Sequence, residues 1–181
     1  MKIKNNYPFL VGKKISLRKL TVQDAKSKNY LEAANSQKTT RFLEGVGIFP
    51  KTIKELELYI NQESQNQSSL LMGIFKLKNQ CHVGNIHISR INLIHRNANY
   101  GIMLFDKFHG KGYAYEASSL LISHCFSRIG LKRISMHCTI KNKAAIRLYE
   151  RLGAREEGTL KQAFYTGNEF VDMKAYAILN S

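Results

Sequence analysis

The sequence predicts a single α/β domain built around a mixed, mostly antiparallel sheet. Its 181 residues fit one compact domain, and hydrophobic residues make up 44% of them, which is enough to form a core. Along the chain, the spacing of apolar residues changes repeatedly between the period of a helix and the period of a strand. These observations exclude wholesale disorder, and the 2 prolines are too few for a Pro-rich architecture.

The changes of period give the expected order of elements as β-α-α-β-β-β-α-β-α-β-β, with no internal repeat. The expected ranges are 14–18, 21–34, 51–62, 70–77, 83–89, 98–105, 112–129, 132–140, 142–152, 154–165 and 170–179.

In the N-terminal half, the first strand alternates polar and apolar residues. Thr21 and Asp24 then have the spacing of a capping box, which predicts the start of a helix. Glycines and a proline break any period over residues 35–50, and helical spacing returns over 51–62. The polar stretch 61–69 predicts a solvated loop.

In the C-terminal half, three β-rich runs, separated by a short link and then a longer one, predict an antiparallel meander. The next helix has an apolar stripe and is followed by Gly130, a typical C′ residue. After one more strand, Asn142 is expected to cap a helix that Gly153 closes. Two last strands complete the sheet.

The composition indicates a partner with negative charge. Lys and Arg number 28 against 13 Asp and Glu, which gives a net charge of +15. No apolar run approaches the roughly 20 residues of a membrane-spanning helix, and the N-terminus lacks the features of a secretory signal, so we expect a cytoplasmic protein without membrane contact. The 3 cysteines have no C-x-x-C spacing and no histidines stand at i, i+4, so we expect no metal site.

The segment Lys107-Phe108-His109-Gly110-Lys111-Gly112-Tyr113-Ala114 lies between a predicted strand and a predicted helix. A glycine-rich turn at a helix N-terminus directs several backbone N–H groups toward one point, where they can bind phosphate. Neither the Walker pattern nor the full Rossmann pattern is present. A flexible turn without a ligand is the alternative interpretation.

A second motif follows about thirty residues later, Asn142-Lys143-Ala144-Ala145-Ile146-Arg147-Leu148-Tyr149-Glu150-Arg151-Leu152-Gly153. The two motifs in this order closely resemble the GNAT superfamily of acetyl-CoA-dependent N-acetyltransferases. Arg18-Lys19-Leu20 and the segment 165–172 are similar to its ribosomal-protein alanine N-acetyltransferase branch. The stretch from residue 90 through the turn is also similar to bacterial spermidine N-acetyltransferases.

The resemblance implies one GNAT-like domain over residues 1–181, a monomer or homodimer with acetyl-CoA as cosubstrate. Residues 1–70 would form the acceptor-side half and residues 71–181 the acetyl-CoA-binding core. About six to seven strands, splayed near the cofactor site, would be flanked by about four helices.

The resemblance also implies which residues contact acetyl-CoA. Backbone N–H groups of the turn would hold the pyrophosphate, the preceding strand would pair with the pantetheine amides, and Asn142 would touch the pantetheine arm. Lys107 stands where the family usually has Arg or Gln, so it keeps the charge without the bidentate fork. Arg147 lies on a basic helix stripe with Lys143 and Arg151, suited to a phosphate of the cofactor or to solvent. The full set is Met103, Leu104, Phe105, Lys107, His109, Gly110, Lys111, Gly112, Tyr113, Ala114, Asn142 and Arg147.

Acyl transfer to an amine needs a neutral nucleophile and a proton for the leaving thiolate. By resemblance, Tyr149 would lie near the sulfur of CoA and supply that proton. The alternative for Tyr149 is a core residue, since it shares a stripe with apolar neighbours. For the base the candidates are Glu44, His87 and an ordered water.

The acceptor is expected to be a primary amine, and the charge pattern favours a protein N-terminal α-amine. The N-terminal region is rich in lysine and Glu44 is the one acid of residues 35–50, which disfavours a polycation. A ribosome contact would fit the N-terminal basic excess. The alternatives are a small-molecule acceptor (polyamine, aminoglycoside, amino sugar or amino acid) and a non-catalytic RNA- or acyl-CoA-binding module.

Overall fold

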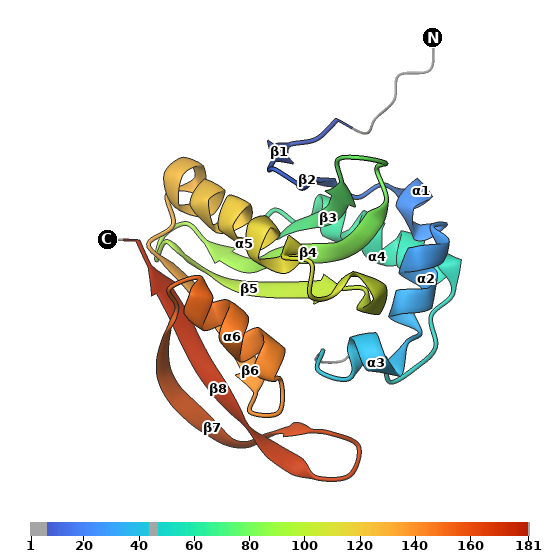
Figure 1. The fold of residues 1–181 in the computed structure, drawn as a ribbon. Coiled ribbons are helices and arrows are strands. Elements are labelled where there is room, and N and C mark those ends of the chain that lie inside the picture. The colour runs from blue at the N-terminus through green and yellow to red at the C-terminus, as the bar shows by residue number, and fades with distance from the viewer. Residues whose placement is uncertain (1–6, 44–46, 181) are drawn as a thin grey trace.

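The computed structural model describes residues 7–43 and 47–180. Eight strands form one sheet in the order β1-β2-β3-β4-β5-β6-β8-β7 (Figure 1). Neighbouring strands are antiparallel except for β5 and β6, which are parallel. The strands are β1 (Leu10–Val11), β2 (Ile15–Lys19), β3 (Leu70–Lys76), β4 (His82–Asn92), β5 (Asn97–Leu104), β6 (Arg133–Thr139), β7 (Arg155–Tyr165) and β8 (Phe170–Leu179).

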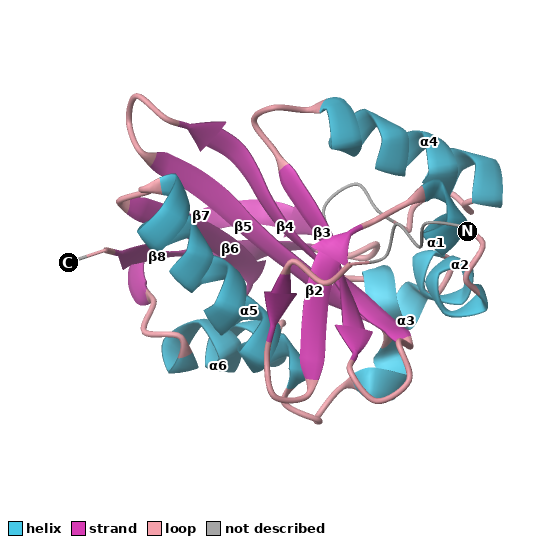
Figure 2. Ribbon diagram, turned by 90° about the horizontal axis from the view of Figure 1, so that it is seen from above, coloured by secondary structure: helices cyan, strands magenta, loops and turns pink. Residues whose placement is uncertain are grey.

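Helices cover both faces of the sheet (Figure 2). α5 and α6 lie on one face, and α4 lies on the other, packed against β3, with α1 and α2 beside it. The α-helices are α1 (Val22–Ala25), α2 (Lys28–Ala34), α3 (Gln37–Thr40), α4 (Ile53–Gln65), α5 (Tyr113–His124) and α6 (Lys143–Arg151). The predicted α/β class and mixed, mostly antiparallel sheet are therefore confirmed.

The N-terminal half differs from the prediction in three details. β1 is an additional strand of two residues, paired with β2, and is too short for a periodic signal. The helix expected over 21–34 is two helices: α1 starts at the predicted capping box of Thr21 and Asp24 and ends at Ala25, and Ser27 is the N-cap of α2. Residues 35–50 include the short helix α3, capped by Ser36.

The helix predicted over 112–129 has an irregular end. α5 stops at His124 and continues as a π-helical turn over Cys125–Ile129. Gly130 follows with φ of +78°, a left-handed conformation that favours glycine. The predicted C′ position of Gly130 is confirmed.

A buried polar group lies where β4 meets α2. His82 is 4% exposed, and its Nε2 lies 2.8 Å from Oδ1 of Asn85. Its ring packs against Tyr30, Phe75 and Phe105 at centroid distances of 5.3, 4.7 and 5.0 Å. Burial lowers the pKa of His82 to about 4, so the ring is neutral in the folded protein at neutral pH.

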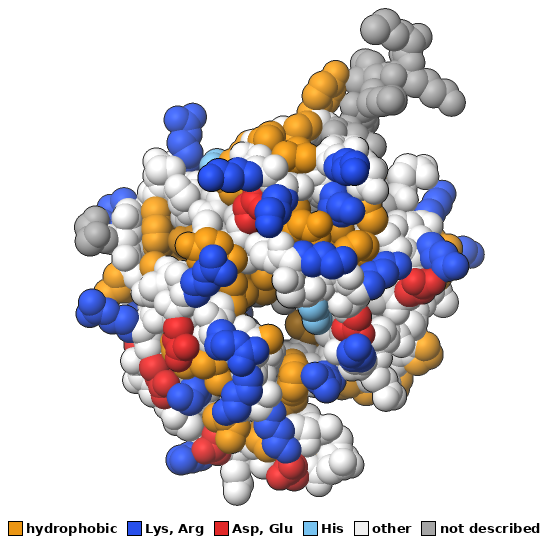
Figure 3. Space-filling view, viewed as in Figure 1, with side chains coloured by type: hydrophobic (Ala, Val, Ile, Leu, Met, Phe, Trp, Pro, Cys, Tyr) orange, Lys and Arg blue, Asp and Glu red, His pale blue; other side chains and the backbone are white. Residues whose placement is uncertain are grey.

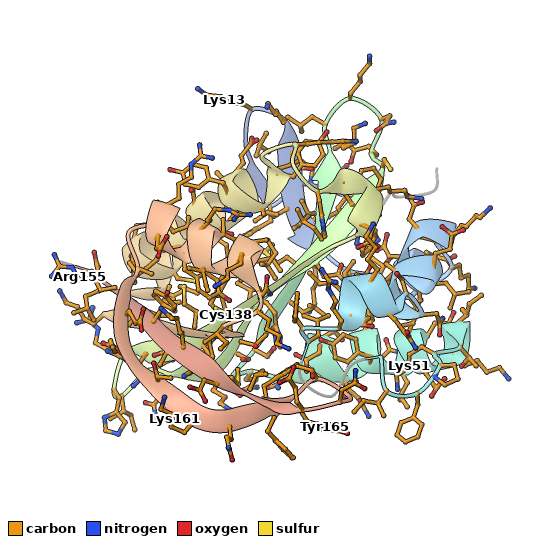
Figure 4. All side chains as sticks on the ribbon, turned by 60° about the horizontal axis from the view of Figure 1, so that its bottom comes forward. Lys13, Lys51, Cys138, Arg155, Lys161 and Tyr165 are labelled. Atoms are coloured by element: carbon orange, nitrogen blue, oxygen red, sulfur yellow. The ribbon has the colours of Figure 1, made fainter. Side chains whose placement is uncertain are left out.

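The β7–β8 hairpin extends from the far end of the sheet, and β7 is its edge strand (Figure 4). Arg155, Lys161 and Tyr165 lie along the outer strand and are exposed. Charged residues and register irregularities on an edge strand oppose pairing with other chains. In the described part of the chain, no helix is both long and apolar enough to span a membrane.

Candidate active site

The parallel strands β5 and β6 separate part of the way along their length. They pair only over Asn97–Asn99 and 133–135, although β5 continues to Leu104 and β6 to Thr139. The predicted splay is therefore present, and within the described part of the chain the second half of β5 has no partner strand on that side. The space-filling view shows the molecule from the side of α5 and α6, and its surface is hollowed near the centre (Figure 3).

The register shows which backbone groups of β5 face this gap. Phe105 donates its N–H to the carbonyl of Val83 (3.0 Å), so its backbone is directed toward β4. Because the direction of backbone groups alternates along a strand, Met103 also faces β4, whereas Ile102 and Leu104 face the gap. Of the predicted residues Met103, Leu104 and Phe105, only Leu104 directs its backbone groups into the gap. Ile102 does so as well, and the sequence alone did not indicate it.

The glycine-rich turn has the conformation that an anion site requires. Gly110 and Gly112 have φ of +72° and +81°, and no described atom lies within 4 Å of a Cβ placed at either residue. Gly112 is the N-cap of α5, so the N–H groups of Tyr113 and Ala114 have no intrahelical acceptor. Open space in front of free N–H groups at a helix N-terminus suits a pyrophosphate.

Side chains of the turn fix its position against the rest of the molecule. Nε2 of His109 lies 2.9 Å from the carbonyl oxygen of Leu104, and Lys111 donates to the carbonyl of Lys107 (3.1 Å). Nζ of Lys107 lies 2.5 Å from Oδ1 of Asn29 and 3.6 Å from Oε2 of Glu32, both on α2. The ammonium of Lys107 therefore points toward α2 rather than into the turn.

α6 lies beside α5 and β6, on the same face of the sheet (Figure 1). Asn142 is its N-cap, and its Oδ1 accepts a hydrogen bond from the N–H of Ala145 (3.1 Å), which confirms the predicted cap. Arg147 is exposed on this helix, and the guanidinium of Arg151 stacks on the ring of Tyr115 in the first turn of α5 (4.0 Å). Lys and Arg side chains gather over α6 beside the hollow (Figure 3).

Tyr149 lies at the fork between β5 and β6, on the face covered by α5 and α6. Its hydroxyl donates to the carbonyl of His137 (3.2 Å), and its ring packs against Tyr100 of β5 and Tyr176 of β8. Burial raises the pKa of Tyr149 and keeps the phenol protonated. Tyr149 is thus a core residue whose protonated hydroxyl lies at the fork.

His87 lies on the opposite face of the sheet, beside α4. Its Nε2 is 2.6 Å from Oγ of Ser69 and 3.2 Å from Oε2 of Glu63. His87 is directly opposite Gly101 in the β4–β5 register, so both residues project from the same face. No described atom lies within 4 Å of a Cβ placed at Gly101, which leaves open space beside His87 where β5 and β6 diverge.

The other candidate base, Glu44, lies outside the described residues. Sequence reasoning missed Glu63 and Ser69, because a solvated loop was expected over 61–69. The carboxylate of Glu116, in the first turn of α5, accepts hydrogen bonds from the N–H groups of Lys13 and Lys14 and holds the β1–β2 turn against α5.

Comparisons with known proteins agree with this architecture. A family model described as an acetyltransferase (GNAT) domain matches residues 14–155. A spermidine N(1)-acetyltransferase of Vibrio cholerae serotype O1 is 32% identical over 99 residues, which are 55% of this chain and 57% of that protein. The match thus spans little more than half the length of that relative.

Two solved structures share the fold over nearly the whole chain. One is a spermidine N-acetyltransferase from Vibrio cholerae in complex with CoA and spermine, with a TM-score of 0.82 and 24% identity over 91% of this chain and 95% of that chain. The other is RimL, a ribosomal L7/L12 alpha-N-protein acetyltransferase in complex with coenzyme A, with a TM-score of 0.85 and 21% identity over 96% and 98%. The family model spans most of the sequence, and the chain therefore belongs to the GNAT family of acetyl-CoA-dependent N-acetyltransferases.

Proposed function

We propose that the protein transfers the acetyl group of acetyl-CoA to a primary amine of a small molecule, and that a linear polyamine is the first acceptor to test. One observation carries this proposal. Glu63 has no Lys or Arg partner among the described residues, and it lies beside His87 and the open space at Gly101. The other acids of α4, Glu55 and Glu57, both pair with lysines. A cationic amine would complement the carboxylate that is left.

The similarity to spermidine N-acetyltransferases supports a polyamine. The sequence alone favoured a protein N-terminal amine, because it placed Glu44 as the one acid of the acceptor segment. Glu63 lies in α4, outside that segment, and its proximity to His87 depends on the packing of α4 against the sheet. Because of the carboxylate of Glu63, we rank a small-molecule amine above a protein N-terminal amine as the acceptor.

On the cofactor side, the roles follow from the backbone. The N–H groups of Tyr113 and Ala114 would hold the pyrophosphate, and the peptide groups of Ile102 and Leu104 would pair with the pantetheine amides. Tyr149 would donate its O–H proton to the sulfur of the leaving thiolate. Burial raises the pKa of Tyr149, so the phenol carries this proton when acetyl-CoA binds.

Besides the attack of the amine, the reaction needs a base for the acceptor ammonium and an acid for the leaving thiolate. His87 accepts one proton from the acceptor ammonium, which leaves a neutral amine on the open side of Gly101. The nitrogen forms a bond to the thioester carbon, the carbon–sulfur bond breaks, and Tyr149 protonates the sulfur. The second amine proton and the proton held by His87 leave to solvent, and solvent restores the proton of Tyr149.

A protein N-terminal α-amine is the second candidate. The net charge of +15 opposes a polycationic acceptor at long range, and RimL has the same fold over 98% of its chain. An acceptor with a single amino group would meet less repulsion than a polyamine.

The test is CoA release from acetyl-CoA at fixed salt with spermidine, an aminoglycoside and peptides that begin with Ala or Ser. N-terminally blocked peptides are the control for transfer to other groups. We expect kcat/KM for spermidine to exceed that for any peptide about tenfold or more, since a second cationic group can reach Glu63. A preference for free peptide N-termini would replace the small-molecule acceptor, and absence of transfer to every amine would contradict the proposed activity.

A further inference from the structure

Glu63, Ser69 and His87 form a compact cluster on the acceptor face. The three residues come from α4, the start of β3 and β4, and Oγ of Ser69 is hydrogen-bonded to Oε2 of Glu63 while lying 2.6 Å from Nε2 of His87. The side chains of His87 and Glu63 are 27% and 18% exposed, so each is partly desolvated and still reachable from solvent. All polar contacts of the His87 ring with described residues are made through Nε2.

The contacts decide where the protons of this cluster lie. Ser69 has one hydroxyl proton, and a carboxylate only accepts hydrogen bonds, so Ser69 donates to Glu63. The hydroxyl oxygen and the carboxylate then both face Nε2 of His87 with lone pairs, which favours a proton on that nitrogen. The neutral ring is therefore the Nε2–H tautomer, and its free lone pair is on Nδ1.

We propose that Glu63 and Ser69 are positioning residues that hold His87 in the Nε2–H tautomer, so that Nδ1 is the atom that removes a proton from the acceptor amine. This inference rests on the proposed acetyl transfer and adds the device that prepares its base. Nδ1 takes one proton from the ammonium, and the resulting imidazolium carries N–H groups on both nitrogens. Glu63 stabilises that cation directly and through Ser69.

The surroundings of His87 make Glu63 the dominant charge. Among the described residues, Glu63 from α4 and Ser69, the residue before β3, contact the ring, and Leu71 of β3 and Gly101 of β5 lie opposite His87 on the neighbouring strands. Burial lowers the pKa of His87, and the charge of Glu63 acts in the opposite direction. Tyr59 of α4 is neutral at physiological pH, because burial raises its pKa to about 12.

Two substitutions test the proposal against the pH profile of kcat/KM, measured with the best acceptor of the panel. His87→Gln keeps an N–H donor near Ser69 and Glu63 and removes the base, so we expect kcat to fall about 100-fold with little change in acetyl-CoA affinity. Glu63→Gln removes the charge that stabilises the imidazolium, so we expect a fall in kcat of about tenfold and an acidic limb of the profile at lower pH.

Glu57→Gln is the matched control, because it removes the same charge from the same helix at a residue paired with Lys26. It should leave both kcat and the acidic limb unchanged, which would separate a local effect of Glu63 from the overall charge of α4. Ser69→Ala should reduce kcat less than Glu63→Gln, since the carboxylate still reaches Nε2.

The outcomes separate this inference from the proposed function. If the folded Glu63→Gln variant transferred acetyl groups at the wild-type rate and its pH profile kept the same acidic limb, the positioning role would be overturned. The acetyltransferase proposal would remain intact. Equal kcat in His87→Gln and wild-type protein would exclude Nδ1 as the proton acceptor. Absence of transfer by the wild-type protein would instead refute the proposed function. Circular dichroism and acetyl-CoA binding confirm that each variant is folded.

Discussion

The two faces of the sheet that meet at the β5–β6 gap are constructed differently. The cofactor face is built from backbone: a turn with two left-handed glycines, the free N–H groups of α5 and the unpaired edge of β5. The acceptor face is built from side chains, with Glu63, Ser69 and His87 brought together from three elements. A backbone site is encoded in consecutive residues, whereas a side-chain cluster depends on how distant elements pack.

The largest expected effect is a loss of stability in acid that originates at the buried His82 of β4. His82 has a pKa of about 4 when folded and about 6.5 when unfolded, because burial disfavours the imidazolium. Since the folded value is lower, the stability due to neutral His82 is complete above pH 6.5 and is lost as the pH falls toward 4, by about 3 kcal/mol in total.

Urea unfolding at several pH values between 7 and 4 measures this effect. His82→Gln does not titrate, so its free energy of unfolding should depend less steeply on pH over the same window, even though the variant is less stable at pH 7. If the free energy of unfolding depended equally steeply on pH in both proteins, the acid sensitivity would originate in groups other than His82.

The next effect concerns Tyr149 on the cofactor face. Tyr149→Phe keeps the ring among Tyr100 and Tyr176 and removes the proton donor, so kcat should fall about 100-fold while the affinity for acetyl-CoA stays nearly unchanged. Steady-state rates and calorimetric titration with acetyl-CoA give the two quantities. An unaltered kcat would show that Tyr149 packs in the core and does not act as the proton donor.

Gly112→Ala tests whether the turn acts through its backbone. The added Cβ would occupy the open space at the N-terminus of α5 in a left-handed conformation, and we expect KM for acetyl-CoA to rise about tenfold. Gly153→Ala is the matched control: Gly153 has φ of +85° and equally open surroundings, but it follows α6. Both variants should lose similar stability, and a similar rise of KM in both would contradict a specific role for the turn.

The smallest effect is expected at the surface of α6. Arg147 is exposed, so Arg147→Ala should raise KM for acetyl-CoA roughly threefold at low salt, and the difference should shrink at high salt. Arg155→Ala removes the same charge from β7 and should have no effect on KM. A rise that persists at high salt would indicate a direct contact with the cofactor rather than long-range attraction.

Much of the fold could be predicted because its signals are local. Period changes located most of the strands and helices, and Gly130 and Asn142 marked helix ends through backbone conformation and a side-chain cap. β1 was not predicted, because a strand of two residues is too short to show an alternation of polar and apolar side chains. The split of the helix expected over 21–34 was not predicted, because no glycine or proline stands at residues 26 and 27, between α1 and α2.

In the candidate site too, the features predicted from the sequence were local, and the features that were missed depend on residues distant in the chain. The turn at 107–114 was predicted from glycine spacing, whereas the direction of Lys107 toward α2 depends on Asn29 and Glu32, which are distant in sequence. His87 was one candidate among several. Its pairing with Glu63 was not foreseen, since the two residues belong to different elements and only packing joins them.

By itself, the sequence determined most of the elements, the glycine-rich turn and the membership of a family with paired motifs, because these depend on residues close together in the chain. The tertiary structure decided the register of β4 against β5, and with it which backbone groups face the gap and which side chain stands beside Gly101. It also brought the carboxylate of Glu63 to His87. A shift of one residue would reverse both faces, and register is set by the packing of the whole sheet.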